Sequence, residues 1–298
     1  MTTIWLPVTL ALASSLMYAL MVLFVRMGVR TASSATALWL TLAVNVVLLW
    51  GWSLVAYGPQ FERWWEWRYF ALSGLFAPLL GRLLQFQGMA KLGANITTAI
   101  TLTHPVFTVL LAVLFLNEPI GLIGLLGILL VVAGSVAVGA EKDKVRGTRV
   151  LRASWLLLPV LASLCYGIAM VFRKIGLGSG SDPVTAAAVT VTSAWLCSGI
   201  YAVLSGQHRS MRCDRKEFKF FVLAGISSGV GPVLAYSALQ RADLVVVAPL
   251  AATSPLFTLM LTRAFLHAEE IFSFKVLGGT VATVAGVIMV ATFGASNG

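Results

Sequence analysis

The chain has 298 residues, of which 59% are hydrophobic and only 11% are charged. Soluble domains carry roughly 25% charged residues, so this composition excludes an ordinary soluble protein and indicates a membrane protein. The formal net charge of +10 does not indicate nucleic-acid binding, because the basic residues lie in short loops between apolar runs, where charge sets the orientation in a membrane. There are three cysteines, two of them inside apolar runs, and they predict no disulfide framework.

Long apolar runs follow one another along the chain, each near the ~20 residues that a helix needs to cross a bilayer. They are continuously apolar, without the period-two alternation of barrel strands, and this favours helices. The first run has no basic segment before it and no cleavage pattern after it, so we expect it to be retained as a span. The predicted fold is an all-α membrane protein with ten transmembrane helices, at residues 4–25, 33–57, 69–90, 94–116, 119–140, 155–172, 183–205, 218–239, 245–266 and 271–293.

Two stretches of the chain occur twice. "SLMYALMVLFVRMG" at residues 15–28 returns without a gap as "SLCYGIAMVFRKIG" at residues 163–176, and "HPVFTVLLAVLFLNE" at 104–118 returns as "SPLFTLMLTRAFLHAEE" at 254–270. The chain is therefore predicted to be two copies of a five-helix unit. Because five is an odd number, the second copy would cross the membrane in the opposite direction, and inverted repeats of this kind are typical of secondary transporters.

The repeats define the predicted domain organisation. The first five-helix repeat is expected at residues 1–140 and the second, inverted one at 155–298, with a basic cytoplasmic linker at 141–154. Most Lys and Arg residues fall in the loops on one side of the predicted spans, and the positive-inside rule assigns this side to the cytoplasm. Both termini are then expected on the outer, periplasmic side.

The segments "HPVFTVLLAVLFLNEP" and "SPLFTLMLTRAFLHAEE" are each followed by a glycine-rich span with an Ala-Gly pair, Ala133-Gly134 and Ala285-Gly286. In these features the chain resembles EamA-type members of the drug/metabolite transporter superfamily, over nearly its whole length. The resemblance implies a carrier of the bacterial inner membrane, often an exporter of amino acids, other metabolites or drugs, with a central cavity lined by helices of both repeats. It supplies no catalytic motif, so the site has to be argued from the residues. We expect no enzymatic activity, no cofactor and no metal ion.

Charge inside the predicted spans is scarce. All 11 acidic residues fall in loops or at span ends, so the deep carboxylate with which small multidrug antiporters exchange protons for cationic drugs is missing. Arg82 is the charge that lies deepest in a span, and on a helix it shares a face with Gln85, Gly74 and Pro78. Its guanidinium would favour a carboxylate or phosphate, held through two parallel hydrogen bonds. The alternative is that Arg82 extends toward the lipid headgroups.

His104 belongs to a polar stripe on the fourth predicted span, together with Thr97, Thr101 and Thr108. Polar groups in lipid must face protein or water, and Pro105 leaves a backbone carbonyl near residue 101 without its helical donor. Histidine titrates near neutral pH, so His104 could bind substrate or carry a proton. The alternative is that it holds neighbouring helices together.

Further candidates are related by the repeat. The pair Ser254-Pro255 stands where the first repeat has His-Pro, and kinked helices at matching positions of two repeats indicate a binding site. The hydroxyls of Tyr18 and Tyr166 need partners in hydrocarbon, so we expect them to face each other across the cavity. The same positions could instead serve packing alone. The predicted substrate-binding residues are Ser15, Tyr18, Arg82, Gln85, Phe86, Thr101, His104, Ser163, Tyr166, Tyr236 and Ser254, and the predicted kink residues are Pro78, Pro105, Pro232 and Pro255.

The predicted function is secondary transport, most simply export, of a small anionic or zwitterionic metabolite such as an amino acid, by alternating access to a cavity between the repeats. The runner-up is efflux of hydrophobic or cationic drugs. An intramembrane enzyme would need a cluster of acids, bases or nucleophiles near a membrane face, and the three histidines do not cluster with acids at any motif spacing. A non-transporting assembly or sensor protein is a third class. We expect a monomer or homodimer whose partners are a small-molecule substrate and the lipid bilayer.

Overall fold

The computed structural model describes residues 2–28, 34–58, 64–92, 97, 100–140, 153–206, 213–266 and 274–293. These residues form helices joined by short turns, and none of them lies in a β-strand. The helices are α1 (Thr2–Gly28), α2 (Ser34–Tyr57), α3 (Trp67–Gly74), the π-helical segment η2 (Leu75–Gly81), α4 (Arg82–Leu92), α6 (His104–Leu116), α7 (Leu122–Ala140), the 3-10 turn η3 (Ala153–Leu156), α8 (Leu157–Gly178), α9 (Pro183–Leu204), α10 (Arg215–Leu239), α11 (Leu244–Ala251), α12 (Ser254–Leu266) and α13 (Phe274–Phe293).

Six stretches of helix are long and apolar enough to cross a membrane. They are Trp5–Gly28, Thr36–Tyr57, Trp67–Met89, Ser154–Gly178, Pro183–Leu204 and Arg215–Leu239. Shorter apolar helices stand at the positions of the four other predicted spans, at His104–Leu116, Leu122–Ala137, Leu244–Thr258 and Gly278–Val290. The all-helical prediction is therefore confirmed for the described residues, and six of the ten predicted spans have the length of a full crossing.

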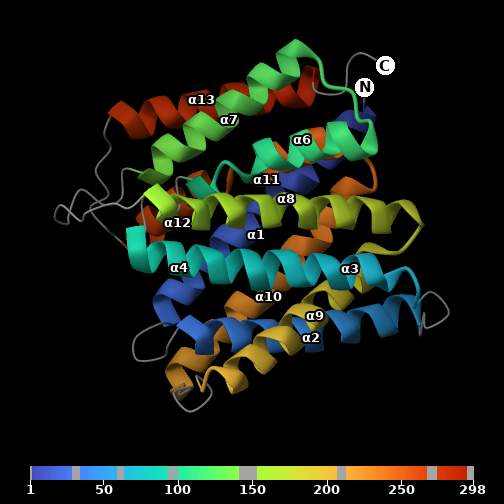
Figure 1. The fold of residues 1–298 in the computed structure, drawn as a ribbon, viewed down its shortest axis with the longest axis vertical. Helices are drawn as coiled ribbons and strands as arrows, with labels where there is room; N and C mark the ends of the chain where they lie inside the picture. The colour runs from blue at the N-terminus through green and yellow to red at the C-terminus, as the bar shows by residue number, and fades with distance from the viewer. Residues whose placement is uncertain are drawn as a thin grey trace.

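The helices lie side by side across the long axis of the molecule (Figure 1). The pair α7 and α13 forms one end, α2 and α9 lie at the other, and α1 and α8 pass through the middle. α1 and α8 carry the two copies of the first repeated stretch, and they run in opposite directions in Figure 1. The middle of the molecule is thus built from equivalent helices of opposite direction.

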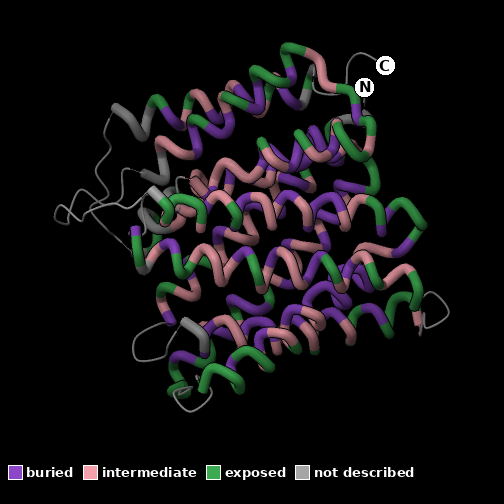
Figure 2. The backbone as a smooth tube through the Cα atoms, viewed as in Figure 1, coloured by how far each residue is buried: buried purple, intermediate pink, exposed green. Residues whose placement is uncertain are grey.

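Burial follows this arrangement (Figure 2). Buried residues gather where the central helices pass between their neighbours, and every residue from Leu244 to Leu250 of α11 is buried. Exposed residues follow the outer faces of α7 and α13, where the exposed side chains include Leu122, Leu126, Val281 and Ile288. An apolar outer surface of this kind suits contact with lipid.

Glycines set the contact between α7 and α13. A Cβ added at Gly286 would lie 2.6 Å from the carbonyl oxygen of Gly127. A Cβ added at Gly134 would lie 2.7 Å from the amide nitrogen of Thr283 and would also overlap the carbonyl of Gly279. Gly127 and Gly134 correspond in the repeat to Gly279 and Gly286, so the two contacts are copies of each other. The backbones touch at both places, which larger residues would prevent.

Candidate functional site

Two helices are interrupted at equivalent places, immediately before a proline. Helix at Thr101 gives way to a turn at residues 102–103, and α6 starts at His104 with Pro105 in its first turn. In the second repeat α11 ends at Ala251, a turn follows, and α12 starts at Ser254-Pro255. A proline cannot donate a backbone hydrogen bond, so Pro105 and Pro255 leave the carbonyl groups of Thr101 and Ala251, four residues earlier, without their usual helical donor.

The hydroxyls of Ser163 and Ser15 lie beside these two carbonyls and also beside the carbonyl of the residue before each of them. The hydroxyl of Ser163 on α8 lies 3.0 Å from the carbonyl oxygen of Ile100, and that of Ser15 on α1 lies 2.9 Å from the carbonyl oxygen of Leu250. Each serine also reaches a carbonyl of its own helix, at 3.0 Å and 3.2 Å respectively. Both side chains are fully buried. The hydroxyls predicted to contact substrate therefore hold the broken helices to the first helix of the opposite repeat.

The threonines of the polar stripe are turned into protein. The Thr101 hydroxyl donates to the carbonyl oxygen of Thr97 at 2.7 Å, and the Thr108 hydroxyl donates to that of His104 at 3.0 Å. His104 itself is half-buried, and its Nδ1 lies 3.2 Å from the carbonyl oxygen of Thr101. The hydroxyl of Thr97, in contrast, is buried without a hydrogen-bond partner among the described residues.

Tyr166 joins the two repeats in the middle of the molecule. Its hydroxyl donates to Oε1 of Gln85 on α4 at 2.8 Å. Its ring lies on Gly81, where an added Cβ would be 2.8 Å from the ring, and it meets the His104 ring edge-on at a centroid distance of 6.0 Å. A residue larger than glycine at position 81 would displace the tyrosine.

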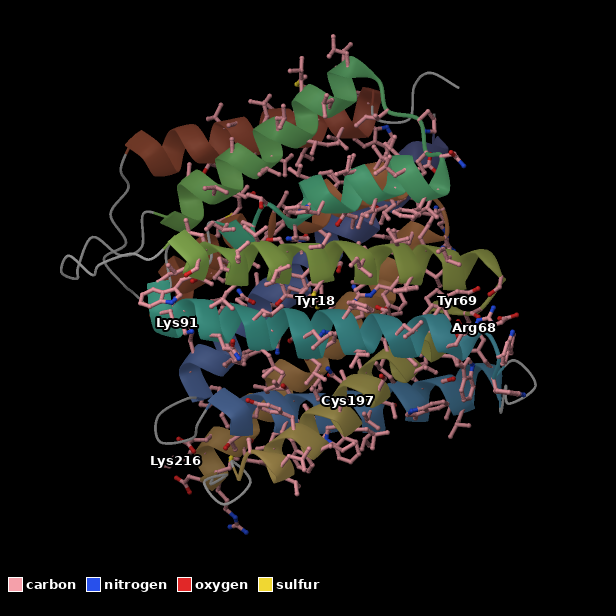
Figure 3. The ribbon with its side chains drawn as sticks, viewed as in Figure 1. Tyr18, Arg68, Tyr69, Lys91, Cys197 and Lys216 are labelled. Atoms are coloured by element: carbon pink, nitrogen blue, oxygen red, sulfur yellow. The ribbon has the colours of Figure 1, made fainter. Side chains whose placement is uncertain are left out.

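Tyr18 occupies the equivalent place in the other repeat. Its ring lies 3.5 Å from the position of a Cβ added at Gly231, the residue of α10 that corresponds to Gly81. Figure 3 places Tyr18 near the middle of the bundle, away from the helix ends at which Lys91 and Arg68 lie. Each repeat therefore places the tyrosine of its first helix on a glycine of the other repeat's third span.

Arg82 begins α4 and lies near both tyrosines. It is close enough to Tyr18 and to Tyr166 to act electrostatically on both hydroxyls. Its guanidinium is thus directed into the bundle, where the alternative of extension toward the headgroups would have placed it at the surface. The helix before it is π-helical from Leu75 to Gly81, with Pro78 inside, whereas Pro232, the counterpart of Arg82, lies within the continuous α-helix α10.

A second arginine was missed by the sequence interpretation. The predicted sixth span ended at residue 172, but α8 continues to Gly178 and carries Arg173 into the bundle. Nε of Arg173 donates to the Ser73 hydroxyl at 2.7 Å, and its guanidinium lies 5.5 Å from the centroid of the Tyr236 ring. Arg173 also acts electrostatically on Tyr18 and His104. The repeat held a signal for it, because its counterpart Val25 lies inside the first predicted span.

The remaining predicted residues differ in their surroundings. Tyr236 is 1% exposed, and its hydroxyl donates to Thr190 at 3.0 Å, whereas its counterpart Phe86 is 40% exposed. Ser254 is half-buried at the start of α12, and its carbonyl accepts from Thr258.

We call the residues that approach one another in the middle of the bundle the central cluster: Tyr18, Arg82, Gln85, His104, Tyr166, Arg173 and Tyr236.

No acidic residue balances the central cluster within the described part of the chain. There the described carboxylates lie at helix ends, and neither Arg82 nor Arg173 forms an ion pair with one. The same residues contain no group of His, Cys, Asp and Glu side chains that could hold a metal ion. The central cluster therefore combines two guanidinium groups with hydroxyl, amide and imidazole groups.

Glu118 is an acidic residue that links the two repeats. Its two carboxylate oxygens accept from the amides of Leu244 and Val245 at 3.0 Å and 2.9 Å, in the first turn of α11. The first amide groups of α11 have no partner within their own helix, and the helix macrodipole favours a negative charge there. Burial and the neighbouring Asp243 raise the pKa of Glu118, against the lowering effect of the two amides and of Lys174.

Comparison with known proteins agrees with this architecture. The EamA-like transporter family matches the chain twice, at residues 5–140 and 153–292. No curated protein matches the chain. A solved structure titled "Crystal structure of protein" superposes with a TM-score of 0.81 over 96% of this chain and 98% of its own, at 14% sequence identity, and so shares the fold. With two matches that follow the two repeats, the chain belongs to the EamA-like transporter family.

Proposed function

We propose that this membrane transporter is a secondary transporter of a small anionic or zwitterionic metabolite, which it binds at the central cluster. The observation that carries the proposal is the pair Arg82 and Arg173, two guanidinium groups directed into the bundle without a carboxylate partner among the described residues. A cation inside a membrane protein is expensive unless it is paired, and it is a functional site by default.

A substrate carboxylate would supply the missing charge. Arginine binds carboxylates through two parallel, charge-assisted hydrogen bonds, and such bonds contribute about 1.5–3 kcal/mol each. The hydroxyl of Tyr18 and the amide of Gln85 lie beside Arg82 and offer further donors and acceptors. An amino group of a zwitterion would meet the half-buried ring of Tyr166 through cation–π contact.

Alternating access is the mechanism that this architecture favours. The central cluster draws residues from both repeats, α1 and α8 run in opposite directions, and each repeat contains one interrupted helix beside the cluster. These features are typical of carriers in which two halves rock around a site near the midplane. We further propose export across the bacterial inner membrane, with both termini periplasmic, in line with the charge bias of the loops.

Counterflow in proteoliposomes tests the proposal. Purified protein is reconstituted and screened with amino acids, organic acids and quaternary amines, and the accepted compound is measured again with Arg82→Gln and Arg173→Gln. We expect anions or zwitterions to be accepted, and each substitution to reduce flux about 10- to 100-fold through loss of a charge-assisted bond. Lys91→Gln serves as control, because Lys91 lies at a helix end against Trp155.

Two other outcomes of the flux measurements would change the proposal. Transport of cations alone would replace the proposal with efflux of cationic drugs. Unchanged flux in both arginine variants would remove the guanidinium groups from the site.

A further inference from the structure

A pocket of ≈ 320 Å³ lies where the end of α1 meets the start of α10, far from the central cluster. Its lining consists of Met27 at the end of α1 and of Lys216, Glu217, Lys219, Phe220 and Leu223 on α10. Gly28 lets the two helices meet closely, since an added Cβ there would be only 3.0 Å from Cβ of Phe220. The pocket is therefore bounded by two helices in direct contact.

The lining changes from charged to apolar along α10. Lys216, Lys219, Phe220 and Leu223 lie at intervals of three and four residues, which places them on one face of the helix. From the first lysine to Leu223 the helix rises about 10 Å. Both lysines are exposed at the helix end, while Leu223 is 43% exposed deeper in the span. This order of charge outside and hydrocarbon inside is that of a phospholipid.

The charge of the pocket is positive although Glu217 lines it. The Glu217 carboxylate is 3% exposed and accepts from the amide of Asp214 at 3.1 Å as part of a capping box. The Asp214 carboxylate in turn accepts from the amide of Arg215 at 2.7 Å. Within the described residues, Lys216 and Lys219 have no acidic partner. Two ammonium groups one turn apart are thus directed to solvent at the end of a membrane span.

We propose that this pocket binds the headgroup of an anionic phospholipid, with the phosphate between Lys216 and Lys219 and the first acyl methylenes on Phe220, Leu223 and Met27. α1 and α10 are both long enough to cross the membrane, so the pocket at their common end lies at headgroup level. Basic pockets between spans on the cytoplasmic side are where such lipids are held, and the charge bias of the loops assigns this end to the cytoplasm.

The test compares lipids and soluble anions on the full chain in detergent. Lipid retention is counted by native mass spectrometry, and the melting temperature is measured with phosphatidylglycerol, phosphatidylcholine or inorganic phosphate. The variants are Lys216→Gln/Lys219→Gln and Leu223→Ser. The control is Lys91→Gln, because Figure 3 shows Lys91 and Lys216 at the same end of the bundle.

We expect phosphatidylglycerol to bind and to raise the melting temperature of the wild type. Affinity should be on the order of thirty-fold weaker in the double lysine variant, because each lysine beside an anionic headgroup strengthens binding by about fivefold. Leu223→Ser should weaken phosphatidylglycerol binding without creating a response to phosphate, and Lys91→Gln should leave it unchanged. Equal binding of phosphatidylcholine, unchanged binding in the double variant, or an equal response to inorganic phosphate alone would each overturn the proposal.

Discussion

The hydroxyl of Tyr166 lies 2.8 Å from Oε1 of Gln85, and this hydrogen bond joins the first helix of the second repeat to the third span of the first repeat. Tyr166→Phe should therefore lower the free energy of unfolding by about 1 kcal/mol, the usual contribution of one such bond. The double variant Tyr166→Phe/Gln85→Leu should cost less than the two single changes added together. Denaturant unfolding in detergent measures all three, and strictly additive losses would show that the bond is not formed.

The two serine contacts at the helix breaks should have similar strengths. Ser15→Ala and Ser163→Ala each remove a buried hydroxyl from a backbone carbonyl at the helix break of the opposite repeat. We expect each to lower the free energy of unfolding by about 1 kcal/mol, and the double variant by the sum, because distant sites add. Ser254→Ala is the comparison at a half-buried position. A loss confined to one of the two buried serines would contradict equivalent roles.

Two glycine-to-alanine substitutions in α13 should separate the effect of the contact with α7 from the effect of helix propensity on stability. Gly286→Ala would place a Cβ 2.6 Å from the carbonyl oxygen of Gly127, whereas nothing lies within 4 Å of a Cβ added at Gly278 on the same helix. The first change should therefore lower the melting temperature, since overpacking costs about 1–3 kcal/mol. The second should leave it unchanged or raise it, because alanine favours helix by about 1 kcal/mol over glycine. Equal melting temperatures for the two variants would show that α7 and α13 do not touch at Gly127.

Glu118 should make stability depend on pH in a definite direction. Its folded pKa is raised above the ordinary 4.5, chiefly by burial. The folded protein then binds the proton more tightly than the unfolded chain, so this contribution to stability is complete below pH 4.5 and is lost as pH rises through the folded pKa. Glu118→Gln resembles the protonated side chain and cannot titrate.

The difference between wild type and Glu118→Gln isolates this group from all others that titrate. Melting temperatures measured from pH 4 to pH 8 should show the wild type losing stability relative to the variant as pH rises above 4.5. A constant difference across this range, or a gain of the wild type with rising pH, would contradict the raised pKa.

Much of the fold can be predicted from the sequence, because a helix that crosses lipid needs a long apolar run and because the two repeats are similar enough to be recognised directly. The ends of the spans are harder to predict than their positions. The sixth span was predicted to end at residue 172, so Arg173 was not recognised as part of the bundle. A basic residue at the end of an apolar run can lie in the loop or on a further turn of the helix. The sequence alone does not show that Arg173 contacts Ser73 inside the bundle. Alignment with Val25 of the first repeat would have resolved the choice.

The candidate site could be predicted only in part. Sequence reasoning named Tyr18, Arg82, Gln85, His104 and Tyr166, and the structure brings them near one another. Their contact with substrate stays a prediction. The partners of Ser15, Ser163 and Glu118 lie more than 60 positions away along the chain, and no local pattern encodes such pairings.

The repeat divides the middle of the molecule into a part that both copies share and a part that they do not. The serines at the helix breaks and the tyrosines that lie on glycines occur in both copies. Arg82 has Pro232 as its counterpart, and Arg173 has Val25. The serines and tyrosines thus keep the two-fold relation of the repeats, whereas the two arginines break it. Under the proposed alternating access, a bound anion would contact the same side of the protein whether the site faces one side of the membrane or the other.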